Sequence, residues 1–474
     1  MRKIFITILS LVVLASCMSD NQYENYNRDP KNPTQVDAAF LFNDAMKSLV
    51  DQMTSTNVNT NVYRMFSQYW TETTYTDEAN FDLTNRNIPQ NHWSEMYRDV
   101  LLDLTDAQNI VMESDMSAAD KTVRMAQTEV LLVYTWQQMV DTFGDIPYSQ
   151  ALDAGTYPLP AYDDAATIYT DLLSRIDAAI ADLGGSGEGF SIDNLYGGDV
   201  SAWHKFAASL KLRIGIRLAD SNATVAKSAV ESAYSAGVFS SNADNASFVY
   251  LGTSNPNPVW TSLVQSGRND FVAANTLVDI MNGLDDPRRP VYFNENLGPD
   301  TYDGGPYGEN NSYESYTHVG DMLTDPTNPA SLMDYAEVSF YLADAAARGW
   351  SVGGTAEEHY NNGITASFDY WGVADVASYL AKPEVAYATA SGDWREKIGT
   401  QFWLAMYNRG FEGWTVWRMY DAPTLNLPAI SGLPVPTRYT YPVNEQNLNE
   451  ANWMAGSTAI GGDEQTTKLF WDAN

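Results

Sequence analysis

The sequence is poor in cysteine, in histidine and in basic side chains. Its 474 residues include one cysteine and four histidines, and 27 lysines and arginines stand against 60 aspartates and glutamates, for a formal net charge of −33. A single cysteine excludes internal disulfides, and a chain of this size can build a core without them. The charge argues against nucleic acid and against polybasic attachment to anionic lipid, because both depend on clustered Lys and Arg. Such a charge is typical of a protein kept soluble after export.

The common signatures of catalysis and of metal binding are also missing. The histidines lie far apart, and none belongs to a His-Glu-x-x-His motif. There is no Gly-x-Ser-x-Gly elbow, P-loop or dinucleotide fingerprint. A glycoside hydrolase with paired carboxylates stays open, because 60 acidic residues offer many pairs. We expect no cofactor; an acidic loop could hold structural calcium, but no stretch matches an EF-hand loop.

One long hydrophobic run is present, at the N-terminus. Residues 1–17 begin with the basic Arg2 and Lys3, continue through the apolar residues 4–14, and end in Leu-Ala-Ser-Cys at Cys17. The run is shorter than the roughly 20 residues that span a bilayer, so it indicates a cleaved signal peptide. The Leu-Ala-Ser-Cys sequence resembles the lipobox of bacterial lipoproteins, which predicts lipidation of Cys17. The alternative is an ordinary secretory signal with a chance cysteine.

The rest of the chain divides into a short tether and one large domain. Residues 18–37 are polar at their start and lack apolar periodicity over 18–33, which predicts a flexible tether. The content of 44% hydrophobic and 12% aromatic residues is that of a globular protein. We predict a single domain over residues 38–474, with a loop-rich insert at about 242–330 that is dense in Gly, Pro, Asn and Tyr.

Helical spacing of apolar residues predicts a mostly α-helical fold. The predicted helices cover residues 38–50, 93–110, 120–141, 164–183, 200–219, 223–236, 274–282, 331–348, 356–370 and 394–408. Six of them form successive pairs, namely 120–141 with 164–183, 200–219 with 223–236, and 331–348 with 356–370. Such pairs are typical of tetratricopeptide-type repeats, although the match to the 34-residue consensus is loose and the pattern alone leaves repeats open. The tail, residues 420–474, is predicted to be loop-rich.

Two stretches combine aromatic rings with polar loop residues, which is the composition that sugar binding needs. Rings stack on the C–H faces of a saccharide while acids and amides take its hydroxyls. The candidate ligand contacts are Trp70, Tyr75, Phe81 and Trp93 in the first stretch, and Trp260, Tyr292, Tyr302, Tyr307, Tyr313 and Tyr316 in the second.

Each candidate has a structural alternative. Trp70 and Trp93 border predicted helices, which favours the core. The tyrosines of residues 302–316 are the ones we expect to be exposed, either to a ligand or to a protein partner. Replacing Tyr302 and Tyr307 by Ala is therefore expected to weaken binding and to leave the melting temperature nearly unchanged.

An ordered set of short segments resembles a known family. The segments are residues 68–75, 93–97, 143–148, 203–213, 286–288, 335–345, 360–364, 413–418 and 438–442. Together with the lipobox they resemble the SusD/RagB family of nutrient-binding outer-membrane lipoproteins, in its SusD-like second branch. Asp344 departs mildly from the pattern, where we expect Glu.

The resemblance implies a scaffold of tetratricopeptide-like helix pairs, a loop-rich face that binds a glycan or another nutrient, and a location at the outer membrane facing the exterior. It also implies a partner, a TonB-dependent outer-membrane barrel of the SusC type. Three hypotheses therefore stand: a nutrient-binding lipoprotein without catalysis, a lipid-anchored helical-repeat module that binds peptide or protein, and an anchored glycoside hydrolase.

Overall fold

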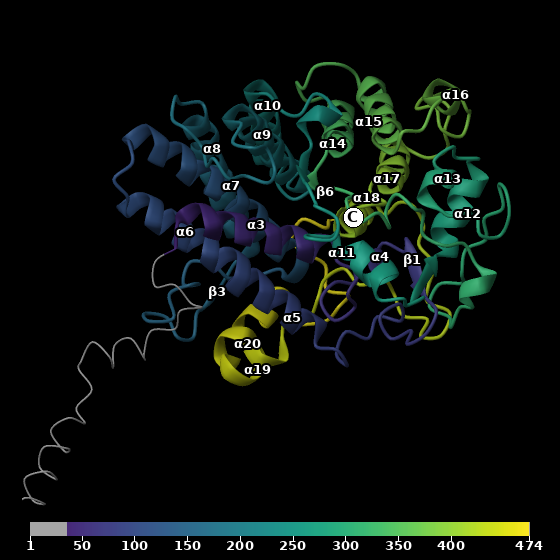
Figure 1. Cartoon of the computed structure of the whole chain (residues 1–474), viewed down its shortest axis with the longest axis horizontal. Helices are drawn as coiled ribbons and strands as arrows, with labels where there is room; N and C mark the ends of the chain where they lie inside the picture. The colour runs from purple at the N-terminus through teal and green to yellow at the C-terminus, as the bar shows by residue number, and fades with distance from the viewer. Residues whose placement is uncertain (1–35, 474) are drawn as a thin grey trace, which may run out of the picture. The chain divides into compact units, whose positions relative to one another are not determined.

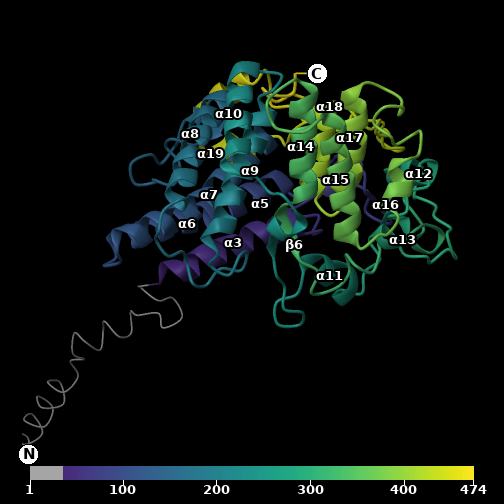
Figure 2. The same cartoon turned by 90° about the horizontal axis from the view of Figure 1, so that it is seen from above.

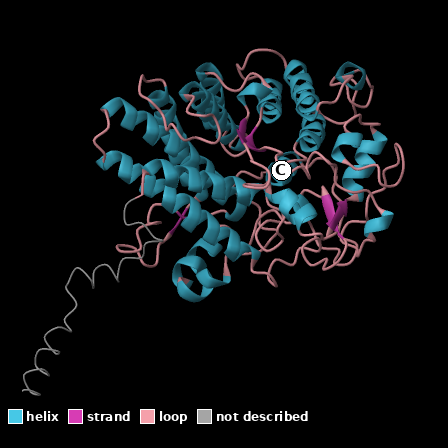
Figure 3. Cartoon of the chain, in the orientation of Figure 1, coloured by secondary structure: helices cyan, strands magenta, loops and turns pink. Residues whose placement is uncertain are grey.

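The computed structural model describes residues 36–473. The predicted signal peptide, Cys17 and residues 18–35 of the predicted tether lie outside the described residues. From Ala38 onward the chain forms one compact unit, built mainly from helices joined by long loops (Figures 1 and 3). No helix of the described part is long and apolar enough to cross a membrane.

The helices of the first layer lie next to one another in the same order as in the sequence. Its helices are α3 (Ala38–Thr54), α6 (Leu102–Glu113), α7 (Ala118–Phe143), α8 (Ala165–Leu183), α9 (Val200–Arg217) and α10 (Ala223–Ala236). Each packs on the next, α3 on α6, α6 on α7, and so on to α10 (Figure 2). The predicted pairing of 120–141 with 164–183, and of 200–219 with 223–236, is confirmed by these contacts.

Side-chain caps set the ends of these helices. The Ser117 side chain accepts a hydrogen bond from the backbone N–H of Asp120 at the start of α7, and Asp164 does the same for Thr167 at the start of α8. Helix α7 ends at Gly144, whose φ of +90° is a conformation that glycine adopts without strain.

A second group of helices comes from the C-terminal half of the chain. Its members are α14 (Tyr335–Ala347), α15 (Ala356–Trp371), α17 (Trp394–Ala405) and α18 (Gly410–Tyr420). Helix α14 packs on α15, on α17 and on α9, so it joins the two groups. Thr355 caps α15 in a reciprocal pair with Glu358.

The predicted helix 331–348 begins too early. Its first residues form β6 (Ala330–Met333), which pairs antiparallel with β4 (Ala246–Phe248) and leaves the helix to start at Tyr335. The residues of β6 carry apolar side chains that suit a helix equally well, so only the distant partner strand decides its conformation.

The regions predicted to be loop-rich hold several short elements. Around the insert these are α11 (Pro258–Trp260), a π-helical turn (Thr261–Gln265), β5 (Phe271–Ala273), α12 (Asn275–Gly283), α13 (Arg289–Tyr292) and two 3-10 turns (Asn242–Asp244 and Tyr313–Ser315). Further short elements lie outside the regions predicted to be loop-rich. They are α4 (Tyr63–Phe66), β1 (Trp70–Glu72), α5 (Ile88–Ser94), the π-helical Glu95–Leu101, the paired strands β2 (Ile146–Pro147) and β3 (Tyr162–Asp163), and α16 (Val376–Leu380). The tail, predicted as loops, also contains α19 (Val443–Leu448) and α20 (Glu450–Ala459).

The β1–β5 ladder decides where the candidate site lies. It is antiparallel, with Trp70 opposite Ala273 and Glu72 opposite Phe271. The ladder brings together the two aromatic stretches, which are about 200 residues apart in the sequence.

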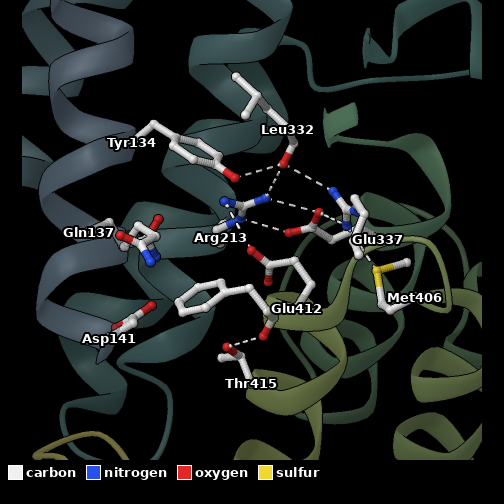
Figure 4. A network of polar contacts seen from close by, with 12 residues as sticks. Tyr134, Gln137, Asp141, Arg213, Leu332, Glu337, Met406, Glu412 and Thr415 are labelled. Atoms are coloured by element: carbon white, nitrogen blue, oxygen red, sulfur yellow. Dashed lines mark hydrogen bonds and ion pairs between the residues drawn. The ribbon is translucent and has the colours of Figure 1, made fainter. Parts of the chain in front are cut away.

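A buried chain of ion pairs holds the two helical groups together (Figure 4). Arg213 of α9 donates to Glu337 of α14 at 2.7 Å, and Arg409 donates to the same carboxylate. Arg217 of α9 donates to Glu412 of α18 at 2.9 Å. All five side chains are buried. Burial by itself would raise the pKa of Glu337, but the charges of Arg213 and Arg409 lower it to about 2.

Candidate functional site

A pocket of about 360 Å³ opens beside the β1–β5 ladder and the residues that follow α11. Figure 1 labels β1 and α11. It is lined from three parts of the chain: the loop after α3, the segment that follows β1, and residues 261–271. Its polar lining residues are Thr56, Asn57, Asn59, Glu72, Thr74, Arg86, Thr261, Ser262, Ser266, Arg268 and Asp270. Hydroxyls, amides and charged groups thus surround a space large enough for a small ligand.

Tyr75 supplies the aromatic surface of this pocket. Its side chain is 69% exposed, although large apolar rings are usually covered. Its backbone has φ of +56°, which is an uncommon and strained conformation for an aromatic residue. An exposed ring held in a strained loop offers a flat face on which a saccharide can stack.

Thr56 places an unsatisfied polar atom at the same pocket. The residue is 5% exposed, and its hydroxyl has no hydrogen-bond partner among the described residues. A buried polar group without a partner costs about 1–3 kcal/mol.

Glu72 and Arg86 line the pocket, and a third charged residue, Glu78, is buried beside Arg86. Glu72 accepts a hydrogen bond from the backbone N–H of Ala79 at 2.9 Å, and Arg86 forms an ion pair with Glu78. Burial of Glu72 and the neighbouring carboxyl of Glu78 raise the pKa of Glu72 to about 10. Glu72 therefore keeps its proton at neutral pH.

The rim of the pocket carries an exposed ion pair. The Nε of Arg268 donates to Asp270 at 2.5 Å, with side-chain exposures of 59% and 30%. The backbone N–H of Thr73 donates to the carbonyl of Asp270 at 2.9 Å, so the loop that carries this pair is tied to the residue after β1.

This arrangement suits binding better than glycoside hydrolysis. Of the neighbouring acids Glu72 and Glu78, only Glu72 lines the pocket, and Glu78 is fully buried. Glycosidases place their two carboxyls about 5 Å or more apart, on either side of the bond that they cleave. In the described part of the chain, no cluster of three or more His, Cys, Asp or Glu side chains could hold a metal ion.

The structure corrects the position of most predicted ligand contacts. The aromatic residues Trp70, Phe81, Trp93, Tyr292, Tyr302 and Tyr307 belong to the hydrophobic core. The core alternative for Trp70 and Trp93 is therefore confirmed, and the predicted exposure of Tyr302 and Tyr307 is wrong.

Specific partners hold these rings inside. The Tyr307 hydroxyl donates to the carbonyl of Met65 at 2.8 Å, and Tyr302 lies under the guanidinium of Arg289 at 5.6 Å. Trp93 packs edge-on against Phe143, with ring centroids 4.9 Å apart. These aromatic side chains of the loops are buried because the long loops fold back over the helices, where apolar side chains anchor them.

Three further candidates are half-buried and do not line the pocket. Trp260 precedes the lining residue Thr261. Tyr313 stacks on His318 with centroids 3.7 Å apart, and Tyr316 lies nearby in the chain. Of the predicted contacts, Tyr75 alone lines the pocket.

Sequence reasoning missed the polar lining residues. The Asn- and Thr-rich residues 54–61 and the segment 267–270 lie outside the aromatic stretches or between their rings. Their density of Asn, Thr, Arg and Asp beside Gly was the available signal.

A scaffold of packed helix pairs that presents a polar, aromatic pocket among long loops defines a class of helical ligand-binding proteins. The family model "SusD-like_2: Starch-binding associating with outer membrane" matches residues 30–442. The chain therefore belongs to the SusD-like family, which confirms the resemblance and the predicted mostly helical fold.

Solved structures agree with this assignment. A chitin-binding SusD homologue from Flavobacterium johnsoniae is 26% identical, with a TM-score of 0.78 over 92% of this chain and 99% of that one. A SusD homologue from Bacteroides uniformis is 26% identical, with a TM-score of 0.79 over 92% and 100% of the two chains. One from Bacteroides ovatus is 25% identical, with a TM-score of 0.78 over 92% and 99%. No curated protein sequence matches.

Proposed function

We propose that this protein is a surface lipoprotein that binds an oligosaccharide in the pocket around Tyr75 and delivers it to an outer-membrane transporter without catalysis. The main observation behind this proposal is that the exposed ring of Tyr75, on a strained backbone, lines one pocket together with amides, hydroxyls and guanidinium groups. Membership of a family described as starch-binding, and a chitin-binding homologue of the same fold, support a glycan as the ligand.

Isothermal titration against maltooligosaccharides, chitooligosaccharides and acidic oligosaccharides tests the binding step. Replacing Tyr75 by Ala should lower the affinity for the bound sugar roughly 3- to 10-fold, since ring stacking contributes about 0.5–1.5 kcal/mol. The melting temperature should stay unchanged, because the ring is exposed. Tyr157→Ala is the matched control, since Tyr157 is also exposed and does not line the pocket.

Flat titrations for every sugar, with binding of peptides instead, would favour the alternative of a helical-repeat module for peptide or protein. Shortened sugars after long incubation would favour the hydrolase alternative, which the burial of Glu78 outside the pocket lining does not support.

The membrane anchor and the transporter are separate parts of the proposal. Cys17 should incorporate radiolabelled palmitate in cells, and Cys17→Ser should release the protein from the membrane fraction. A SusC-type TonB-dependent barrel should co-purify with the wild-type protein from detergent-solubilised outer membranes. Recovery without any barrel would contradict the transporter part and leave the glycan-binding part standing.

A further inference from the structure

The pocket presents two arginine side chains to a ligand, in a chain that is strongly acidic. With 27 basic residues against 60 acidic ones, most surfaces of this protein repel an anion. Arg86 and Arg268 nevertheless line one pocket together, one from each of the two segments joined by the β1–β5 ladder.

Each arginine forms an ion pair beside the pocket that it lines. Arg86 is paired through Nε with Glu78, and its side chain is 30% exposed. Arg268 is paired through Nε with Asp270, and its side chain is 59% exposed. Among the described residues, the terminal nitrogens of neither guanidinium donate a hydrogen bond. The two terminal nitrogens of a guanidinium match the paired oxygens of a carboxylate or sulfate.

The negative groups around these arginines are mostly withdrawn from the pocket. Glu78 is fully buried and paired with Arg86, and Glu72 is 3% exposed, with its carboxyl accepting a hydrogen bond from the Ala79 N–H. Asp270 is the one lining carboxylate with substantial exposure, 30% of its side chain. A ligand that enters therefore meets two guanidinium groups and one accessible carboxylate.

Resting on the proposed function, we infer that this pocket selects oligosaccharides that carry an anionic group, a carboxylate or a sulfate. The sugar ring stacks on Tyr75, the anionic group lies between Arg86 and Arg268, and hydroxyls reach Asn57. A neutral glycan would fill the same space but leave the charged ends of both arginines without a counterpart. The local cations also offset the repulsion that a chain of charge −33 exerts on an acidic sugar.

Matched sugar pairs separate charge from shape. Oligogalacturonate and its methyl ester share one backbone and differ in the free carboxylates. Hyaluronan oligosaccharides and chitohexaose share N-acetylglucosamine and differ in glucuronate. Carrageenan oligosaccharides carry sulfate without carboxylate and distinguish the two anionic groups. Titration of wild-type protein should give at least one acidic member a roughly tenfold higher affinity than its neutral partner, as for a charge-assisted hydrogen bond.

Arginine variants test the residues. Arg268→Gln should lower the affinity for the acidic sugar about tenfold, and by a larger factor than it lowers the affinity for the neutral partner, whereas Arg268→Lys should fall between, because it keeps the charge and loses the fork. Arg98→Gln is the matched control: Arg98 is 67% exposed, pairs with the neighbouring Asp99, and does not line the pocket. Melting temperatures should be equal for all of these proteins.

The outcomes distinguish this inference from the proposed function. Equal or tighter binding of the neutral partner in every pair, or an Arg268→Gln variant that binds acidic sugar like the wild type, overturns the inference and leaves glycan binding intact. Absence of binding to every sugar, neutral and acidic, overturns both.

Discussion

At the residue scale, exposure separates side chains of the same type. Tyr75 and Tyr307 are both tyrosines in polar loops, yet one is 69% exposed and the other 2%. Tyr307 is buried because its hydroxyl finds the Met65 carbonyl and its ring meets Phe81. Burial of a tyrosine depends on such a partner for its hydroxyl, which neighbouring residues in the chain do not reveal.

Ionisation of Glu72 makes the stability of the folded protein depend on pH. Its pKa is raised to about 10 in the folded protein, from an ordinary value of 4.5. A raised acid pKa means that the folded state binds the proton more tightly, so its stabilisation is complete below pH 4.5 and is lost as the pH rises toward 10. We therefore expect stability to decline over this window.

The variant Glu72→Gln should flatten that decline. Glutamine keeps an acceptor for the Ala79 N–H, and it has no carboxyl proton to lose. Urea unfolding at pH 6 and pH 9 should show a smaller difference for the variant than for the wild type, whose slope is at most about 1.4 kcal/mol per pH unit from this group. The exposed Glu384→Gln serves as control, and identical pH profiles for all three proteins would disprove the assignment.

At the scale of elements, helix packing depends on small residues at crossings. Gly363 of α15 faces Phe340 of α14, and an added Cβ would lie 2.8 Å from the Phe340 ring. That ring is fully buried and stacks on Phe402 at 5.0 Å, so it has no room to move. The predicted pair of helices 331–348 and 356–370 thus forms through a glycine contact.

Gly363→Ala should therefore destabilise the protein. Overpacking costs about 1–3 kcal/mol, which exceeds the gain of up to ~1 kcal/mol in helix propensity. Asn362→Ala, on the exposed side of the same turn, should be neutral or slightly stabilising. Thermal unfolding measures both, and a higher melting temperature for Gly363→Ala would show that α14 and α15 are farther apart.

At the scale of the whole molecule, the buried ion pairs of Figure 4 connect helices from distant parts of the chain. Glu337 receives hydrogen bonds from Arg213 and Arg409, which are 124 and 72 residues away in sequence. Removing one member of such a network leaves buried charge without compensation.

Glu337→Gln should lower the free energy of unfolding by about 3–5 kcal/mol at neutral pH. The pKa of Glu337 is lowered to about 2, so its contribution is present above pH 4.5 and is lost as the pH falls from 4.5 toward 2. The variant should consequently lose less stability on acidification than the wild type. Denaturant titrations at pH 7 and pH 3 measure this, with the exposed Glu309→Gln as control. A variant as stable as the wild type at pH 7 would mean that the network contributes little.

Much of the architecture was predictable from the sequence by itself. Apolar periodicity located most helices to within a few residues, and Thr355 with Glu358 marked the start of α15, because these signals act within one or two turns. The ordered segments also identified the family.

Only the tertiary structure decided which loop side chains face solvent. The β1–β5 ladder joined two distant segments into a pocket, buried Trp70 beside it and left Tyr75 exposed. Arg86 and Arg268 line the same cavity for the same reason. The exposure of a loop side chain, and which side chains it lies near, depend on contacts between residues hundreds of positions apart in the sequence. Helix formation depends on contacts between residues about four positions apart.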